Sequence, residues 1–135
     1  MKLQQDALSA QNISAYGPGW LQIGGQKYPH SVLLCADGRL QAWDCASHAD
    51  LNEQHFALLA EWRPELLLLG SGLRLRFVAP ALLRPLIEAG IGVETMDTLA
   101  AARTYNILVA EGRRVAAALL LESDPAGLSL GPDSR

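Results

Sequence analysis

The segment LLLLGSG, residues 66–72, decides the fold of this 135-residue chain. Its four leucines form an apolar run without polar alternation, which is typical of a strand covered on both faces of a sheet. Gly70-Ser71-Gly72 then ends the run with residues that suit a tight turn. We therefore expect a central strand over residues 66–69.

The sequence after this strand predicts helix, strand, helix and strand in turn. Pro80 can begin the first helix and Gly90 suits its end, while Pro85 should bend the helix or shorten its regular part, because proline lacks an N–H donor. The later elements are expected at residues 91–96, 98–111 and 115–121. The last segment is continuously apolar and predicts a second buried strand.

The helix expected at residues 98–111 has apolar side chains around more than half of its circumference, so we expect it to be largely enclosed. These side chains are Leu99, Ala101, Ala102, Tyr105, Leu108 and Val109. Arg103 and Asn106 fall on one narrow side, and Thr104 and Glu111 fall on another. Polar groups on an enclosed helix require hydrogen-bonding partners.

Short strands separated by turns fill the first half of the chain. They are expected at residues 12–16, 20–23, 26–28, 31–35 and 39–43. Together they predict an antiparallel meander that brings Trp20, Tyr28 and Trp43 over the α/β half. A short helix at residues 55–62 links the halves. The fold class is therefore α/β: one compact three-layer domain, with a mixed central sheet flanked by helices and an added N-terminal antiparallel β meander.

Length and composition predict a single domain at residues 10–122. A chain of 135 residues, half of them hydrophobic, can build a core without disulfides or metals. The end after residue 122 is rich in Gly, Pro, Ser and Asp, so we expect residues 123–135, like residues 1–9, to be flexible.

Charge and cysteine content limit the partners and the compartment. A net charge of −3 and a pI near 5.5 argue against nucleic-acid binding through phosphate contacts. Residues 1–10 do not resemble a signal peptide, and no apolar run reaches the about 18 residues that span a bilayer. We expect a cytoplasmic protein without direct membrane insertion, with both cysteines reduced. It is expected to be a monomer, or a weak homodimer through an open strand edge.

One candidate ligand pocket follows from the topology. If the strands ending at Gly70 and Met96 are parallel neighbours, the loops after them lie side by side, where open α/β sheets bind ligands. The candidate residues are Gly70, Ser71, Gly72, Asp97, Thr98, Arg103 and Asn106. They could hold a small polar or anionic ligand. The alternative is that the glycines only form a turn, Asp97 caps a helix, and Asn106 bonds to backbone.

Other reactive residues predict no catalytic or metal site. His48, Asp50 and His55, with Asp44 and Cys45, lack the spacing of a four-ligand metal site and suit a polar loop better. No nucleophile has an adjacent base that the sequence can place. We therefore expect no metal, no cofactor and no catalytic residue, and an enzyme is the less favoured interpretation.

Four blocks carry a family resemblance: Gly70-Ser71-Gly72, Met96-Asp97-Thr98, Thr104-Tyr105-Asn106, and the final block EGRRVAAA at residues 111–118. In this order they resemble the domain-of-unknown-function family that includes the adipogenesis-associated domain protein and a mitochondrial respiratory complex I assembly factor. The match spans about residues 13–121, and the turn at residues 16–20 and Trp43 also fit. The family commonly has Gly-Thr-Gly where this chain has Ser71, and many members have Cys where it has Ala102, so no thiol-based role is carried over.

The resemblance implies a three-layer α/β fold and a role through protein partners. We therefore expect a non-catalytic protein-interaction domain with an unknown protein partner, assisting assembly of a membrane-associated, respiratory-type complex. The alternative is a binder of a small polar or anionic ligand, or a weak enzyme, that uses the loops after Gly70 and Met96. Because a fold does not fix a function, both remain open.

Overall fold

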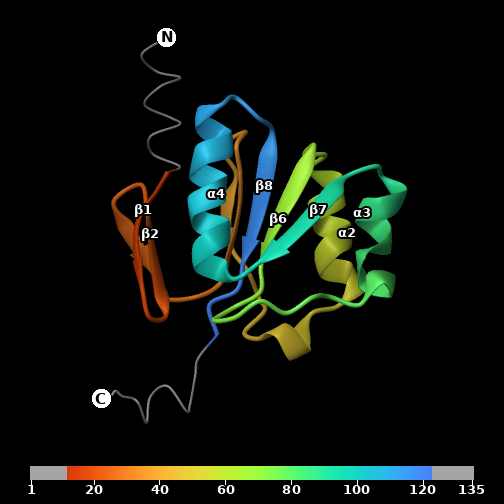
Figure 1. Ribbon diagram of the computed structural model, residues 1–135, viewed down its shortest axis with the longest axis horizontal. Coiled ribbons are helices and arrows are strands. Elements are labelled where there is room, and N and C mark those ends of the chain that lie inside the picture. The colour runs from red at the N-terminus through yellow and green to blue at the C-terminus, as the bar shows by residue number, and fades with distance from the viewer. Residues whose placement is uncertain (1–11, 123–135) are drawn as a thin grey trace.

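The computed structural model describes residues 12–122 (Figure 1). The ends expected to be flexible, residues 1–9 and 123–135, lie outside the described residues, as do residues 10 and 11 of the expected domain. Eight strands form two sheets within the described range.

The larger sheet has five strands in the order β5-β4-β8-β6-β7. β6 (Leu66–Gly70) lies between β8 (Val115–Leu119) and β7 (Gly92–Met96) and is parallel to both. Every residue of β6 and of β8 is buried. The central strand predicted from the leucine run is confirmed, and so is the second buried strand.

The expected meander is divided between the two sheets. β1 (Ile13–Gly17), β2 (Trp20–Ile23) and β3 (Gln26–Tyr28) form a separate antiparallel sheet. β4 (Val32–Cys35) and β5 (Leu40–Ala42), the next hairpin, instead join the large sheet, because β4 pairs antiparallel with β8.

The added N-terminal meander is therefore confirmed, but it has three strands, not five. The break falls at Pro29, which directly follows β3. A proline there has no N–H group with which to continue a ladder from β3 to β4.

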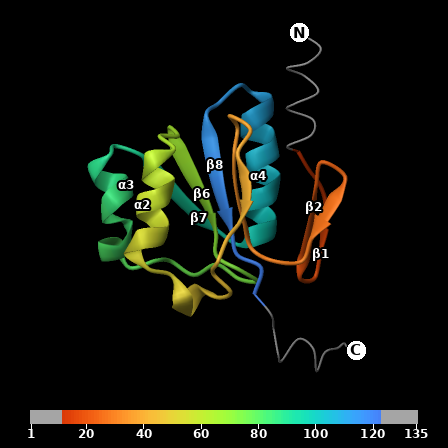
Figure 2. The same ribbon diagram turned by 180° about the vertical axis from the view of Figure 1, so that it is seen from behind.

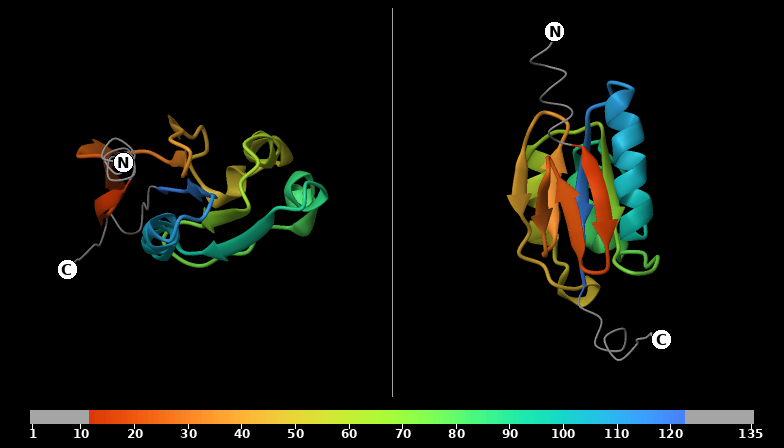
Figure 3. Two further views of the ribbon diagram at one scale, coloured as in Figure 1. Left: turned by 90° about the horizontal axis from the view of Figure 1, so that it is seen from above. Right: turned by 90° about the vertical axis from the view of Figure 1, so that its left-hand side faces the viewer.

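Helices cover both faces of the large sheet, which confirms the three-layer architecture (Figures 1 and 2). α2 (Glu53–Glu61) and α3 (Arg84–Glu88) lie on one face, and α4 (Thr98–Ala110) lies on the other. The sheet of β1 to β3 lies beside α4 (Figure 3). Successive β6 residues point to opposite faces, so Leu67 and Leu69 pack with the α2 and α3 side, and Leu66 and Leu68 pack with the α4 side.

Pro85 limits its helix as expected. A 3-10 turn, η2 (Pro80–Leu83), comes first, and α3 begins at Arg84 and continues for only five residues. Pro85 occupies the first turn of α3, where its missing N–H costs no intrahelical bond.

The expectation that residues 98–111 form a largely enclosed helix is wrong in part. Ala101, Ala102 and Tyr105 are buried, but Leu99 is exposed and Ile107 is 58% exposed. The large sheet covers one face of α4 and the small sheet covers one flank, so part of the helix surface, including the Leu99 and Ile107 side chains, stays exposed.

The aromatic cover from the first half is also partial. Trp43 is buried on the α2 side of the sheet, and Tyr28 packs against the core on the α4 side. Trp20 belongs to neither core: Lys27 lies over its ring, with Nζ 4.4 Å from the ring centre. The expectation that Trp20 covers the α/β half is therefore wrong.

Candidate functional site

The loops after β6 and β7 lie side by side, as their parallel pairing requires. The Ser71 amide donates to the Met96 carbonyl at 2.8 Å, and the Thr98 amide donates to the Gly72 carbonyl at 2.9 Å. Gly70 is needed because a Cβ there would lie 2.9 Å from both the Thr98 Cα and its Oγ1. The start of α4 therefore packs directly on the end of β6.

The Ser71 hydroxyl is buried and closes the loop that follows β6. Its Oγ lies 2.7 Å from the Arg74 carbonyl oxygen and 3.2 Å from that of Met96, and it accepts a bond from the Arg76 amide at 3.0 Å. A hydroxyl has one donor and two acceptor sites, and these internal partners take the donor and one of the acceptor sites. The Ser71 hydroxyl therefore stabilises the loop to which it belongs.

The Thr98 hydroxyl, which is also buried, joins three elements. It accepts from the Gly72 amide at 2.9 Å and donates to the Leu120 carbonyl at 2.7 Å. The ends of β6 and β8 are thereby fixed to the first residue of α4.

Asp97 caps α4, and its carboxylate accepts from the Ala100 amide at 2.9 Å. It also faces a cavity of about 340 Å³ at this end of the sheet. The wall is mainly apolar and comes from the β1–β2 turn, the loop after β6, the start of α4 and the end of β8: Tyr16, Gly17, Pro18, Gly19, Gly72, Leu73, Asp97, Thr98, Leu99, Leu120, Leu121 and Glu122. Asp97 and Glu122 are its two carboxylates.

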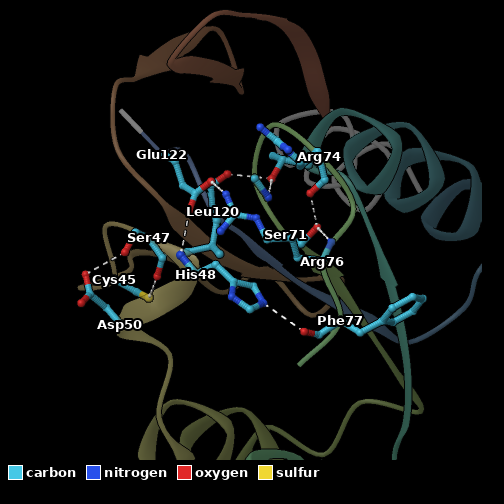
Figure 4. A network of polar contacts seen from close by, with 12 residues as sticks. Cys45, Ser47, His48, Asp50, Ser71, Arg74, Arg76, Phe77, Leu120 and Glu122 are labelled. Atoms are coloured by element: carbon cyan, nitrogen blue, oxygen red, sulfur yellow. Dashed lines mark hydrogen bonds and ion pairs between the residues drawn. The ribbon is translucent and has the colours of Figure 1, made fainter. Parts of the chain in front are cut away.

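Glu122 connects this end of the sheet to η1 (His48–Asp50) (Figure 4). Its side chain is only 9% exposed. It accepts from the His48 amide at 2.8 Å and pairs with the Arg76 guanidinium at 3.3 Å. It also fills the space beside Gly72, which has a φ of +107° and no room for a Cβ. The imidazole of His48 contacts the Phe77 carbonyl at 3.1 Å.

Cys45 lies near this network and has the properties of a structural thiol. Its Sγ donates to the Ser47 carbonyl at 3.3 Å, and the Ser47 hydroxyl donates to the Asp50 carboxylate at 3.1 Å. Burial, which outweighs the bond to Ser47, raises the pKa of Cys45 to about 11. The thiol is therefore neutral near pH 7 and a poor nucleophile.

Arg103 and Asn106, the other two expected site residues, do not line the cavity. The Asn106 side chain accepts from the Ile13 amide at 3.0 Å and donates to the Ile13 carbonyl at 2.8 Å. Arg103 donates to the Tyr16 hydroxyl at 3.1 Å. Both residues hold β1 against α4, and only Arg103 reaches the cavity wall, through Tyr16.

Sequence reasoning missed the loop at residues 73–77, Leu-Arg-Leu-Arg-Phe. Leu73 is 59% exposed, Leu75 is 49% exposed and Phe77 is 73% exposed. The available signal was apolar and basic residues in alternation directly after a Gly-Ser-Gly turn.

Comparison with known proteins gives a family match over most of the chain. The family described as "Protein of unknown function (DUF498/DUF598)" matches residues 13–120. The human protein named NADH dehydrogenase [ubiquinone] 1 alpha subcomplex assembly factor 3 is 34% identical over an alignment of 137 positions. The alignment covers 95% of this chain and 69% of that protein.

Two solved bacterial structures have a similar fold. A crystal structure of a Bordetella parapertussis protein matches with a TM-score of 0.78 at 41% identity, covering 83% of this chain and 96% of that one. A crystal structure described as an outer membrane protein from Bartonella henselae matches with a TM-score of 0.73 at 30% identity, covering 85% of this chain and 98% of that one. Among residues 12–122 of the present chain, no helix has the length and apolar character needed to cross a bilayer.

Proposed function

The chain belongs to the DUF498/DUF598 family of proteins of unknown function, and from this premise we propose that it is a non-catalytic protein-interaction domain. It assists assembly of a membrane-associated, respiratory-type complex and acts from the cytoplasm. Its partner is another protein, neither a nucleic acid nor the bilayer interior, and the domain itself is a monomer or a weak homodimer.

One observation carries the proposal: polar groups at the end of the sheet bond inward, while apolar groups beside them face outward. The Ser71 and Thr98 hydroxyls bond to backbone groups of the chain itself. Leu73, Leu75 and Phe77 are exposed. Exposed apolar surface of this kind commonly marks a site of interaction with a protein or a membrane.

The family relatives supply the kind of process. The human relative's name describes an assembly factor of an NADH dehydrogenase, and the Bartonella protein is described as an outer membrane protein. The first description concerns assembly of an enzyme complex, and the second concerns a membrane. For the present chain they support a role in which a small domain binds a subunit during assembly.

A second candidate function is supported by the cavity. A chain that binds a small polar or anionic ligand, or acts weakly on one, would use the loops after Gly70 and Met96. Two carboxylates, those of Asp97 and Glu122, line the cavity and would repel an anion, although the Arg76 guanidinium offsets the charge of Glu122. The cavity therefore suits an apolar group better than a phosphate, and we rank this function second.

Co-purification of the tagged full chain from its native cells tests the first candidate. A stoichiometric protein partner that survives washing at high salt is expected, and a chain that is recovered alone under native conditions would contradict the proposal.

A thermal-shift screen against metabolites tests the second candidate. A ligand that stabilises the wild type but not Asp97→Ala would favour it, because ligand binding stabilises the folded state by mass action.

A further inference from the structure

The exposed loop at residues 73–77, which we call the LRLRF loop, is held in place from three directions. The Ser71 hydroxyl binds the backbone of Arg74 and Arg76, Glu122 pairs with the Arg76 side chain, and His48 contacts the Phe77 carbonyl (Figure 4). Two of these anchors, Ser71 and Glu122, are themselves buried or nearly so. The loop is therefore fixed before any partner arrives, which reduces the entropy lost on binding.

The apolar side chains of the LRLRF loop are not used by the fold. Leu75 and Phe77 are exposed, and the Phe77 ring points away from the polar network in Figure 4. Leu73 is also exposed and lines the 340 Å³ cavity. The loop and the cavity therefore form one continuous surface, because Leu73 belongs to both.

The two arginines of the LRLRF loop differ in whether they already form an ion pair. Glu122 already neutralises Arg76, whereas the Arg74 side chain forms no ion pair within residues 12–122. Arg74 is exposed, so its guanidinium can donate hydrogen bonds to a carboxylate from outside the chain. The Asp97 carboxylate of the adjoining cavity also forms no ion pair within residues 12–122, but the N-terminus of α4 partly offsets its charge.

We propose that the LRLRF loop and the adjoining cavity bind an apolar segment of the partner protein that carries a carboxylate. One large apolar side chain of that segment enters the cavity beside Leu73, and a carboxylate of the segment pairs with Arg74. The inference rests on the proposed function and adds the location of the surface and the chemistry of the partner.

The observations favour a protein segment over a lipid surface. The cavity of about 340 Å³ has room for one large apolar side chain, and protein interfaces gain most of their energy from such buried anchors. Anionic membranes attract clusters of about four to eight basic residues, but this loop has one uncompensated arginine in a chain of net charge −3.

The test uses the full-length chain and a phage-displayed library of random 12-residue peptides. We expect selected peptides to share acidic residues next to a large apolar residue. Arg74→Glu and Leu75→Ser should each weaken the binding of a selected peptide by at least about tenfold, because each removes a side chain of the proposed surface. The matched controls are Arg84→Glu and Ile107→Ser, which alter an exposed arginine and an exposed apolar residue elsewhere. Both should bind like the wild type.

Three results would overturn the inference: no enrichment of peptides, enriched peptides without acidic residues, or binding that survives Arg74→Glu and Leu75→Ser. Sedimentation with phosphatidylcholine–phosphatidylglycerol vesicles that Phe77→Ser abolishes would also overturn it and assign the loop to a lipid surface. These failures are distinct from failure of the proposed function. If the native partner still co-purifies with both variants, the function stands and the surface is wrong, whereas no native partner at all removes the function.

Discussion

Ser71-Gly72 and the LRLRF loop are adjacent in sequence but opposite in environment. The first pair is buried, and its polar groups bond to Thr98, Arg74, Arg76 and Met96. The next five residues are exposed and include three large apolar side chains. A Gly-Ser-Gly turn has the composition of a ligand-binding loop, yet its hydroxyl is used for structure. The apolar residues, which would usually form core, are available for binding.

This contrast shows why residue type alone misplaces the site. A hydroxyl is available to a ligand only if the fold leaves it without a partner, and at the end of a parallel sheet many backbone groups compete for it. An apolar side chain is available only if no element covers it. The following variants separate these two environments, in order of decreasing effect on stability.

Thr98→Val should have the largest effect. It keeps the shape of the side chain but leaves the Gly72 amide and the Leu120 carbonyl buried without partners. We expect a loss of roughly 3 kcal/mol in the free energy of unfolding, measured by urea denaturation. Thr104→Val in the same helix is the control, because its hydroxyl contacts only the Met96 sulfur at 3.5 Å, and it should change stability by less than about 0.5 kcal/mol. Equal losses would refute the special role of Thr98.

Ser71→Ala should cost about 2 kcal/mol, because the Arg76 amide and Arg74 carbonyl lose their partner. Amide exchange should accelerate specifically within the LRLRF loop, as seen by hydrogen–deuterium exchange. Ser14→Ala, which removes an exposed hydroxyl 3.3 Å from the Gln22 carbonyl, should leave both measurements near wild type. Unchanged exchange in the loop of Ser71→Ala would mean that the hydroxyl does not hold it.

Asp97→Ala should cost about 1 kcal/mol, the usual effect of losing a helix N-cap. Asp97→Asn should cost little, since asparagine caps equally well. Thermal melting of the two variants distinguishes a cap from a ligand-binding carboxylate. If Asp97→Asn is as stable as the wild type but loses a metabolite found by thermal shift, the carboxylate charge has a function beyond capping.

Much of the fold could be predicted because its signals are local. The leucine run at residues 66–69, Pro85 and the Asp97 cap each act within a few residues of their own position. The partition of the meander could not be predicted, because β4 pairs with β8 across more than 80 residues, and no local pattern records which sheet a hairpin joins. The exposure of Leu99 and Ile107 could not be predicted from the sequence for the same reason, because it depends on where the small sheet ends.

The candidate site was predictable only in its position. Parallel strands bring Ser71, Asp97 and Thr98 to one edge, and the structure places them there. The sequence could not predict that Ser71 and Thr98 are occupied internally, because their partners are backbone groups whose places depend on the complete fold. Glu122 was missed because it lies where the chain turns toward a segment expected to be flexible.

The most direct test measures how much of the native partner co-purifies with the Leu75→Ser/Phe77→Ser double variant. The melting temperature of the variant is measured in parallel. Both side chains are exposed, so the melting temperature should stay within about 2 °C of the wild type. The account predicts that the partner is lost from this stable variant. Recovery at the wild-type level would contradict the claim that the LRLRF loop, and not the buried turn before it, carries recognition.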